Sequence, residues 1–207
     1  EFVVGPLLPS NIVRLIENRD ISINTLSLSQ VDLSVTENNA TNLGRAFPKL
    51  KQFGISPADR AAQVASKGII DGHRKALVIT PNDDRGLTMY DAFREQWESK
   101  GGTIIEHIRF PSNNSDYSTP VKSLLNISSS DHRSTLLRQL LNRNIKSDSR
   151  VRLDADMIFM AARPDATKQI VPQFRFYQTE IPIYATSYNY LDVRDQVDND
   201  MNGVIFL

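Results

Sequence analysis

Short apolar runs rich in β-branched residues alternate with longer segments of helical periodicity along most of this chain of 207 residues. The clearest runs are KALVIT and ADMIFMAA, which occupy residues 75–80 and 155–162 and are apolar at most positions. Continuous apolar strands are typical of a parallel sheet that is covered by helices on both faces. The alternation therefore predicts an α/β fold, with parallel sheets flanked by helices and right-handed crossovers. Further strands are expected over residues 2–5, 23–28, 103–110, 181–186 and 203–207.

Helical periodicity occupies the intervals between these strands. Residues 56–59 (SPAD) have the features of a helix start: a capping serine, a proline at the first helical position and an acid near the positive end of the helix dipole. The strongest amphipathic pattern covers residues 87–100. Its apolar stripe consists of Leu87, Tyr90, Phe93 and Trp97. Other helices are expected over residues 11–18, 117–125, 135–141 and 165–178, with residues 29–46 as a loop.

Composition excludes several classes of function. The chain has 24 basic and 24 acidic residues, so it lacks the positive surplus that a dedicated nucleic-acid-binding protein needs, and we expect no nucleic-acid partner. It has no cysteine, which excludes disulfides, thiolate zinc sites and a cysteine nucleophile. No apolar run approaches the roughly 20 residues that cross a bilayer. The locally basic stretch over residues 131–154 is interpreted as a solvated helix and loop.

The sequence contains no motif that indicates catalysis. It has no phosphate-binding glycine loop, no HExxH and no nucleophile elbow, and its three histidines are interpreted as surface or edge residues. The acidic pair Asp83-Asp84 is interpreted as turn and cap residues. Residues 198–203 (DNDMNG) match the opening of a calcium-binding loop, but an Asp/Asn-rich turn before a strand is favoured, so no metal or cofactor is expected.

Two long segments resemble the type I periplasmic-binding-protein fold. Residues 2–16 are similar to its second strand, loop and helix, and residues 75–110 to a later strand, loop, helix and strand. The last third, residues 154–190 followed by 198–206, closely resembles the LppC/LpoA family of bacterial lipoproteins. The distinctive positions are Asp156, Ala161-Ala162, Pro172, Phe176-Tyr177, residues 182–187, Asp200 and Gly203 with Ile205 and Phe206.

This resemblance implies a non-enzymatic activator of a class A penicillin-binding protein in peptidoglycan synthesis, with peptidoglycan as a second candidate partner. It implies a location on the periplasmic side of the outer membrane of Gram-negative bacteria, held there by a lipid anchor outside this chain. It also implies a fold incomplete at both ends, whose first strand and helix precede Glu1 and whose closing elements follow Leu207. The chain would then be part of a C-terminal domain.

The resemblance also implies two lobes. Residues 1–53 are expected in the first lobe, residues 54–200 in the second, and residues 201–207 on a crossover back to the first. In small-molecule binders of this fold, loops after the strands line a cleft between the lobes. The matching positions are Leu8, Ser10, Ser29, Asn82, Arg85, Gly86, Ser187 and Tyr188.

Two other functions remain open. The first is a periplasmic solute-binding or sensing module for a small ligand such as an amino acid or a muropeptide, in which Ser10 and Ser187 would bind the ligand's carboxylate. The second is a hydrolase on an α/β sheet, which the missing catalytic motifs disfavour. A polar cleft would favour the binding module and bulky apolar side chains the activator, and Leu7-Leu8 favour a filled cleft.

Overall fold

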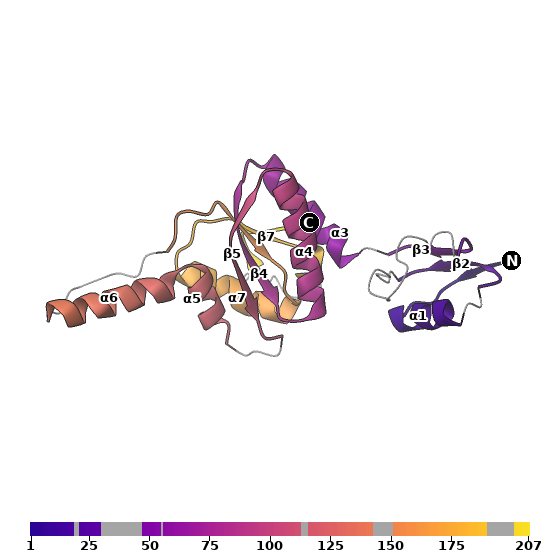
Figure 1. Cartoon of the computed structure of the whole chain (residues 1–207), viewed down its shortest axis with the longest axis horizontal. Helices are drawn as coiled ribbons and strands as arrows, with labels where there is room; N and C mark the ends of the chain where they lie inside the picture. The colour runs from indigo at the N-terminus through magenta and orange to yellow at the C-terminus, as the bar shows by residue number, and fades with distance from the viewer. Residues whose placement is uncertain (19–20, 30–46, 55, 113–115, 143–150, 190–200) are drawn as a thin grey trace. The chain divides into compact units, whose positions relative to one another are not determined.

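The computed structural model describes residues 1–18, 21–29, 47–54, 56–112, 116–142, 151–189 and 201–207. These residues form two compact units, Glu1–Ser56 and Pro57–Leu207 (Figure 1). Both units contain parallel strands and helices, as the alternating sequence pattern predicted. The expected class, α/β with parallel sheets flanked by helices, is confirmed.

The first unit is a three-stranded parallel sheet with one described helix. Strand β1 (Phe2–Val4) pairs with β2 (Asn24–Ser27), which pairs with β3 (Leu50–Gln52). Helix α1 (Pro9–Glu17) connects β1 to β2 and buries Ile12 completely. Strand β3 was not expected from the sequence, and most of the loop expected over residues 29–46 lies outside the described residues.

The second unit contains a five-stranded sheet in the order β5-β4-β6-β7-β8, with every neighbouring pair parallel. Its first elements are α3 (Pro57–Ile70), β4 (Lys75–Pro81), α4 (Asp84–Ser99), β5 (Thr103–Phe110), α5 (Ser118–Leu124) and α6 (Ile127–Leu141). They are followed by β6 (Met157–Met160), α7 (Pro164–Phe176), β7 (Ile183–Ala185), the 3-10 helix η2 (Ser187–Asn189) and β8 (Val204–Phe206).

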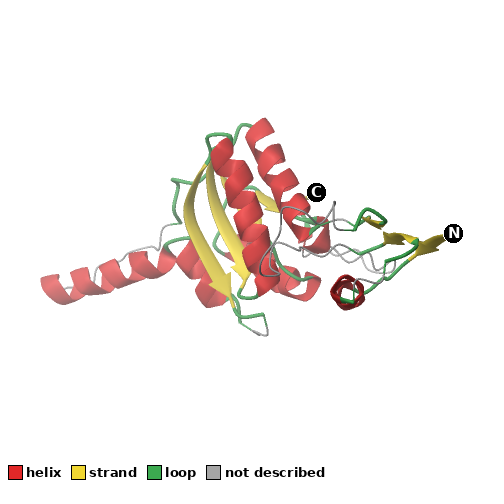
Figure 2. Cartoon of the chain, turned by 45° about the vertical axis from the view of Figure 1, so that its right-hand side comes forward, coloured by secondary structure: helices red, strands yellow, loops and turns green. Residues whose placement is uncertain are grey.

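A separate hydrophobic core covers each face of this sheet. Because side chains alternate along a strand, Leu77 and Ile79 of β4 point to one face, while Ala76 and Val78 point to the other. The first face packs against α5 and α7, and the second packs against α3 and α4 (Figure 2). Phe93 of α4 stacks on a phenylalanine of β6 with ring centroids 4.3 Å apart. The two layers hold the central strands rigidly and thereby position the loops at the strand ends.

Three helix predictions differ from the structure. Leu87 is largely exposed, because the buried row of α4 is Met89, Phe93 and Trp97, spaced four residues apart. Helix α4 begins three residues before the predicted start, with Asp83 as its N-cap. Helix α6 begins at Ile127, eight residues before the predicted start at residue 135, because the buried Ile127 anchors this end.

The end of the chain lies in the second unit. Strand β8 pairs with β7 at the edge of the five-stranded sheet, and the backbone N–H of Ser187 donates to the carbonyl of Leu207 at 2.6 Å. The expected crossover of residues 201–207 back to the first lobe stays a prediction. A parallel edge position gives β8 a full ladder on one side.

Candidate functional site

A serine network connects the loops that follow β1 and β2 in the first unit. The hydroxyl of the fully buried Ser27 lies 3.1 Å from the carbonyl oxygen of Pro6 and 2.9 Å from that of Ser29. It also accepts a bond from the Ser29 N–H at 3.2 Å, and the Ser29 hydroxyl donates to the carbonyl of Leu7. The loops carrying the predicted residues Leu8 and Ser29 are therefore bonded to each other.

The loop after β1 presents apolar surface. Leu8 is the N-cap residue of α1 and has no side-chain oxygen for capping, and both Leu7 and Leu8 are largely exposed. Ser10 lies in the first turn of α1 and is also exposed. Of the two predicted serine hydroxyls in this unit, that of Ser29 already has a backbone partner.

In the second unit, Asp83 shapes the loop between β4 and α4. Its carboxylate accepts a bond from the N–H of Gly86 at 2.7 Å and another from the hydroxyl of Ser112 at 2.9 Å. This confirms the interpretation of Asp83 as a cap residue. Gly86 is buried, and a Cβ there would fall well inside van der Waals contact with the carbonyl oxygen of Pro81. The glycine therefore lets the helix start approach the strand end closely.

The predicted residues of this loop have different exposures. Asn82 is exposed, and its backbone N–H donates to the carbonyl of Phe110 at 2.7 Å, which connects the ends of β4 and β5. Arg85 is exposed as well, in the first turn of α4. Gly86 presents no side chain. The loop thus carries an amide and a guanidinium on a backbone that Asp83 fixes.

A buried asparagine fixes the other predicted loop, after β7. The Asn189 side-chain amide donates to the carbonyl of Met160 at 3.2 Å and to the hydroxyl of Thr167 at 3.3 Å, and its oxygen accepts from the hydroxyl of Thr186 at 2.8 Å. Asn189, Thr167 and Thr186 are fully buried. These bonds attach η2 to β6 and α7, so the backbone that carries Ser187 and Tyr188 is held rigidly.

The structure brings the second-unit residues to one edge of the sheet. The loop with Asn82, Arg85 and Gly86 follows β4, and Ser187 and Tyr188 follow β7. Since β6 lies between β4 and β7, the two strand ends are about 10 Å apart at the usual strand spacing. Ser187 is exposed. Leu8, Ser10 and Ser29 form a separate group at the corresponding end of the first unit's sheet.

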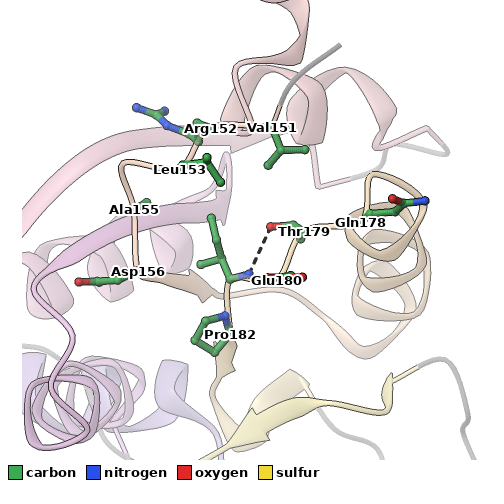
Figure 3. A pocket seen from close by; sticks show the side chains of 10 residues that line it. Val151, Arg152, Leu153, Ala155, Asp156, Gln178, Thr179, Glu180 and Pro182 are labelled. Carbon is green, nitrogen blue, oxygen red and sulfur yellow. Dashed lines mark hydrogen bonds between the residues drawn. The ribbon is translucent and has the colours of Figure 1, made fainter. Parts of the chain in front are cut away.

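A pocket lies at the opposite edge of the second unit's sheet, before the strands begin. It has a volume of about 290 Å³ and lies between residues 151–156 and residues 178–182 (Figure 3). Half of the ten lining residues are apolar, and the others include the charged residues Arg152, Asp156 and Glu180. The carboxylate of Asp156 accepts bonds from the backbone N–H groups of Arg74 and Lys75, both at 2.9 Å. Asp156 therefore joins the starts of β4 and β6.

Arg152 forms an ion-pair cluster beside this pocket. Its guanidinium makes two bonds to the carboxylate of Asp154, at 2.7 and 3.0 Å, and lies 3.6 Å from Glu106 of β5. The bond from Arg152 lowers the pKa of Asp154. Because the charge of Arg152 is neutralised within the protein, the pocket has no free cation at this point for an anionic ligand.

A second titratable cluster lies near the starts of β4 and β7. The hydroxyl of Tyr184 donates to the carboxylate of Asp71 at 2.7 Å and lies 3.2 Å from Nε2 of His73. Bonds from Lys67 and then Tyr184 lower the pKa of Asp71. Burial, followed by the bond to Asp71, raises the pKa of Tyr184 to about 12. The phenol therefore stays protonated near neutral pH and acts as a structural donor.

His107 lies half-buried on β5. Its ring stacks on Tyr90 with centroids 3.7 Å apart, and Nε2 lies 2.9 Å from the hydroxyl of Thr80. Burial, and then the nearby charge of Arg109, lower the pKa of His107 to about 4. His107 is therefore neutral near pH 7 and packs against Tyr90 on β5, the edge strand of the sheet, in agreement with its interpretation as an edge residue.

Neither metal binding nor membrane crossing is indicated by the described part of the chain. No group of three histidine, aspartate or glutamate side chains there could hold a metal ion. Within the same residues, every helix is too short or too polar to cross a bilayer. Half of the calcium-like motif at residues 198–203 lies outside the described residues, since residues 201–203 of it are described.

The family comparison covers the full sequence. The model of the family described as "LppC putative lipoprotein" matches residues 1–207. The chain belongs to the LppC family. The resemblance found in its last third thus extends over its whole length.

Curated relatives of this LppC chain carry the name "Penicillin-binding protein activator LpoA". The protein from Photobacterium profundum is 26% identical over 173 residues, which cover 83% of this chain and 26% of the relative. The protein from Haemophilus influenzae is 36% identical over 101 residues, which cover 49% of this chain and 16% of the relative. The LppC chain thus corresponds to about a quarter or less of these relatives' length.

Solved structures support the fold of the LppC chain. The LpoA C-domain from Haemophilus influenzae, described as a regulator of PBP1A, matches 99% of this chain and 54% of its own with a TM-score of 0.61 and 22% identity. A branched-chain amino acid ABC transporter protein from Rhodospirillum rubrum matches 88% of this chain and 43% of its own, with a TM-score of 0.60 and 18% identity. The expected periplasmic-binding-protein-like fold is therefore confirmed.

Sequence reasoning missed Asn189 and the pocket of the LppC chain. Asn189 had no recognisable signal, because its partners Met160 and Thr167 are 29 and 22 residues away in sequence. The position of Asp156, an acid directly before an apolar strand, was the one feature of the sequence that pointed to this end of the sheet. Arg152 was counted in the basic stretch, where its pairing with Asp154 could have been anticipated from their spacing.

Proposed function

We propose that this LppC chain is the part of its protein that binds and activates a class A penicillin-binding protein in peptidoglycan synthesis. The observation that carries the proposal is the family match over all 207 residues, together with relatives whose name is penicillin-binding protein activator. The related C-domain, described as a regulator of PBP1A, points to the same kind of partner. Peptidoglycan itself is a second proposed partner.

Activation sets a physical requirement on the interface. A binding protein shifts its partner toward the active state only if it binds that state more tightly than the inactive one. A tenfold shift of this equilibrium needs about 1.4 kcal/mol of differential binding free energy. A modest set of contacts meets this requirement, and the rigid sheet of the second unit is a suitable platform for them.

We infer that the role is non-enzymatic and periplasmic. The relatives are named activators, and the described titratable clusters are engaged in packing and ion pairs: Tyr184 holds its proton and His107 is neutral near pH 7. Because the family is described as a lipoprotein, we propose a location on the periplasmic side of the outer membrane through a lipid anchor outside residues 1–207.

A solute-binding module is the alternative function. Its support is the similarity to transporter-associated proteins, which at 18% identity concerns the fold alone. The exposed Leu7 and Leu8 favour the activator, because a carboxylate ligand needs polar donors. The two-lobe assignment and the eight residues predicted to line a cleft stay predictions, since they lie on two separate units.

Reconstituted peptidoglycan synthesis tests the proposal. The full-length natural protein is added to the class A synthase of its own organism with lipid-linked precursor, and glycan length and peptide crosslinks are quantified. We expect a dose-dependent rise that saturates as the synthase becomes occupied. An active synthase whose products do not change, and that shows no binding, would contradict the proposal and direct attention to small ligands.

A further inference from the structure

The distal part of α6 is an exposed apolar helix. Figures 1 and 2 show it extending away from the second unit's sheet, and its main neighbour among the described elements is α5. Every described side chain over residues 135–142 is exposed. Leu136, Leu137, Leu140 and Leu141 are 43, 52, 80 and 55% exposed. Four leucines in contact with water on one short segment need an explanation.

The leucines form one continuous face. Leu136 and Leu140 are four residues apart, as are Leu137 and Leu141, so each pair lies one turn apart on the same side of the helix. Residues at this spacing are the usual anchors when a helix binds in an apolar groove. A helical segment of this length gains little stability in water by itself. Burial of this leucine face against a partner would supply the missing stabilisation.

The charge around the leucine face indicates what kind of partner fits. The distal part of α6, from His132 to Leu141, carries two basic residues, Arg133 and Arg138, and no acid, although the whole chain is neutral. Arg133 lies one turn before Leu136 and Leu137 and is exposed. A partner that covers this segment must therefore combine an apolar groove with acidic side chains at its rim.

A second copy of the chain does not meet these conditions. Two copies would bring basic segments together, which disfavours association. The four leucines also expose only a few hundred Å² of apolar surface, whereas a stable interface buries about 800 Å² on each partner. The leucine face is better suited to be one anchor within a larger interface with a different protein.

We propose that the leucine face of α6 docks into an acidic-rimmed apolar groove on the peptidoglycan synthase. The inference rests on the proposed function and deepens it by assigning the contact surface. Residues Leu136, Leu137, Leu140 and Leu141 supply the apolar anchors, and Arg133 supplies charge at the rim. Docking of a helix that protrudes from the sheet leaves both cores of the second unit undisturbed.

The test compares affinities of the full-length protein for the purified synthase. In the main variant the four leucines are replaced together by alanine, which removes apolar surface and favours the helix. The control is Ile70→Ala on α3, since Ile70 is 77% exposed. We expect Kd to rise at least about tenfold for the leucine variant and to stay unchanged for the control. Circular dichroism checks that both variants keep the wild-type helix content.

A charge variant provides a second readout. Arg133→Glu leaves all four leucines in place, and we expect it to weaken binding about threefold to tenfold and to reduce the salt dependence of Kd. If the wild-type protein binds and activates while both variants bind equally well, the docking inference is wrong and the proposed function stands. If the wild-type protein neither binds nor activates, both fail.

Two further measurements test whether a membrane or a second copy of the chain, instead of the synthase, covers the leucine face. Sedimentation with vesicles that contain anionic lipid detects membrane binding, and analytical ultracentrifugation detects self-association. Loss of either property in the leucine variant, with affinity for the synthase unchanged, would assign the face to a membrane or to a second copy and overturn the proposal. We expect neither property to depend on the leucines.

Discussion

Replacement of Asn189 by alanine should destabilise the second unit strongly. The substitution removes two donated bonds, to Met160 and Thr167, and the acceptor of the Thr186 hydroxyl, all in a fully buried site. Each bond contributes about 0.5–1.5 kcal/mol, and the buried hydroxyl that loses its acceptor adds a penalty, so we expect the free energy of unfolding to fall by about 2–4 kcal/mol. For a unit of this size, that lowers the melting temperature by about 5–15 °C.

Trp97 provides the assay, because it is the chain's one tryptophan and is fully buried in the second unit's core. Urea unfolding followed by its emission gives the midpoint for the wild-type and Asn189→Ala chains. Ser187→Ala is the matched control: it is exposed on the same 3-10 helix and contributes its backbone N–H, which alanine keeps. The control should change stability by less than about 0.5 kcal/mol.

Asn189→Asp tests the same reasoning through pH. At pH 7 a buried carboxylate faces the carbonyl of Met160 without a proton to donate, so Asn189→Asp should lower the free energy of unfolding more than Asn189→Ala does. Burial raises the pKa of this carboxyl above its unfolded value, so the destabilisation should shrink as pH falls and the protonated acid regains a donor. An Asn189→Ala midpoint equal to wild type would refute the hydrogen-bond account.

Three further predictions concern other parts of the second unit. Asp156→Ala should cost about 1–2 kcal/mol in urea unfolding, because the N–H groups of Arg74 and Lys75 lose their acceptor at a partly exposed site; an unchanged midpoint would argue against the strand-joining role. The pKa of His107 is lower in the folded state than its unfolded value near 6.5, so the neutral ring contributes stability above pH 6.5 that is lost as pH falls through 4. Because solvent reaches the half-buried ring, we expect this loss of unfolding free energy to be about 1–2 kcal/mol. The unfolding free energy of His107→Gln, measured against pH, should be flatter over this range. Gly86→Ala should lower the melting temperature by at least a few degrees, since its methyl group would collide with the backbone at the end of β4, and a crystal structure of the variant should show α4 displaced there.

The sequence determined the architecture well where hydrophobic periodicity is strong. The continuous apolar runs at residues 75–80 and 155–162 form two interior strands of the five-stranded sheet, β4 and β6. The buried face of a helix was harder to predict, because a period of 3.6 residues fits more than one row of side chains. Leu87 was expected to be buried, but the buried row of α4 begins at Met89. Strand β3 was missed because three residues, one of them lysine, carry little pattern.

Whether a site residue could be predicted from the sequence depended on how far away in the sequence its partners lie. Asp83 was readable as a cap because its partner Gly86 is three residues away. Asn189 was not, since its role depends on strands and helices brought together by the fold. The exposed leucines of α6 illustrate the same limit, because a leucine row in a sequence predicts burial, and the structure alone shows that these four lie on the surface.

Deletion of this chain from its full-length protein tests the central claim most directly. The measurement is the stimulation of glycan synthesis and crosslinking by the class A synthase, together with Kd, for the full-length protein and for the same protein without residues 1–207. The proposal predicts that the deleted protein loses both the stimulation and the binding, although its remaining part keeps its circular dichroism spectrum. A deleted protein that still stimulates the synthase fully would show that activation resides elsewhere.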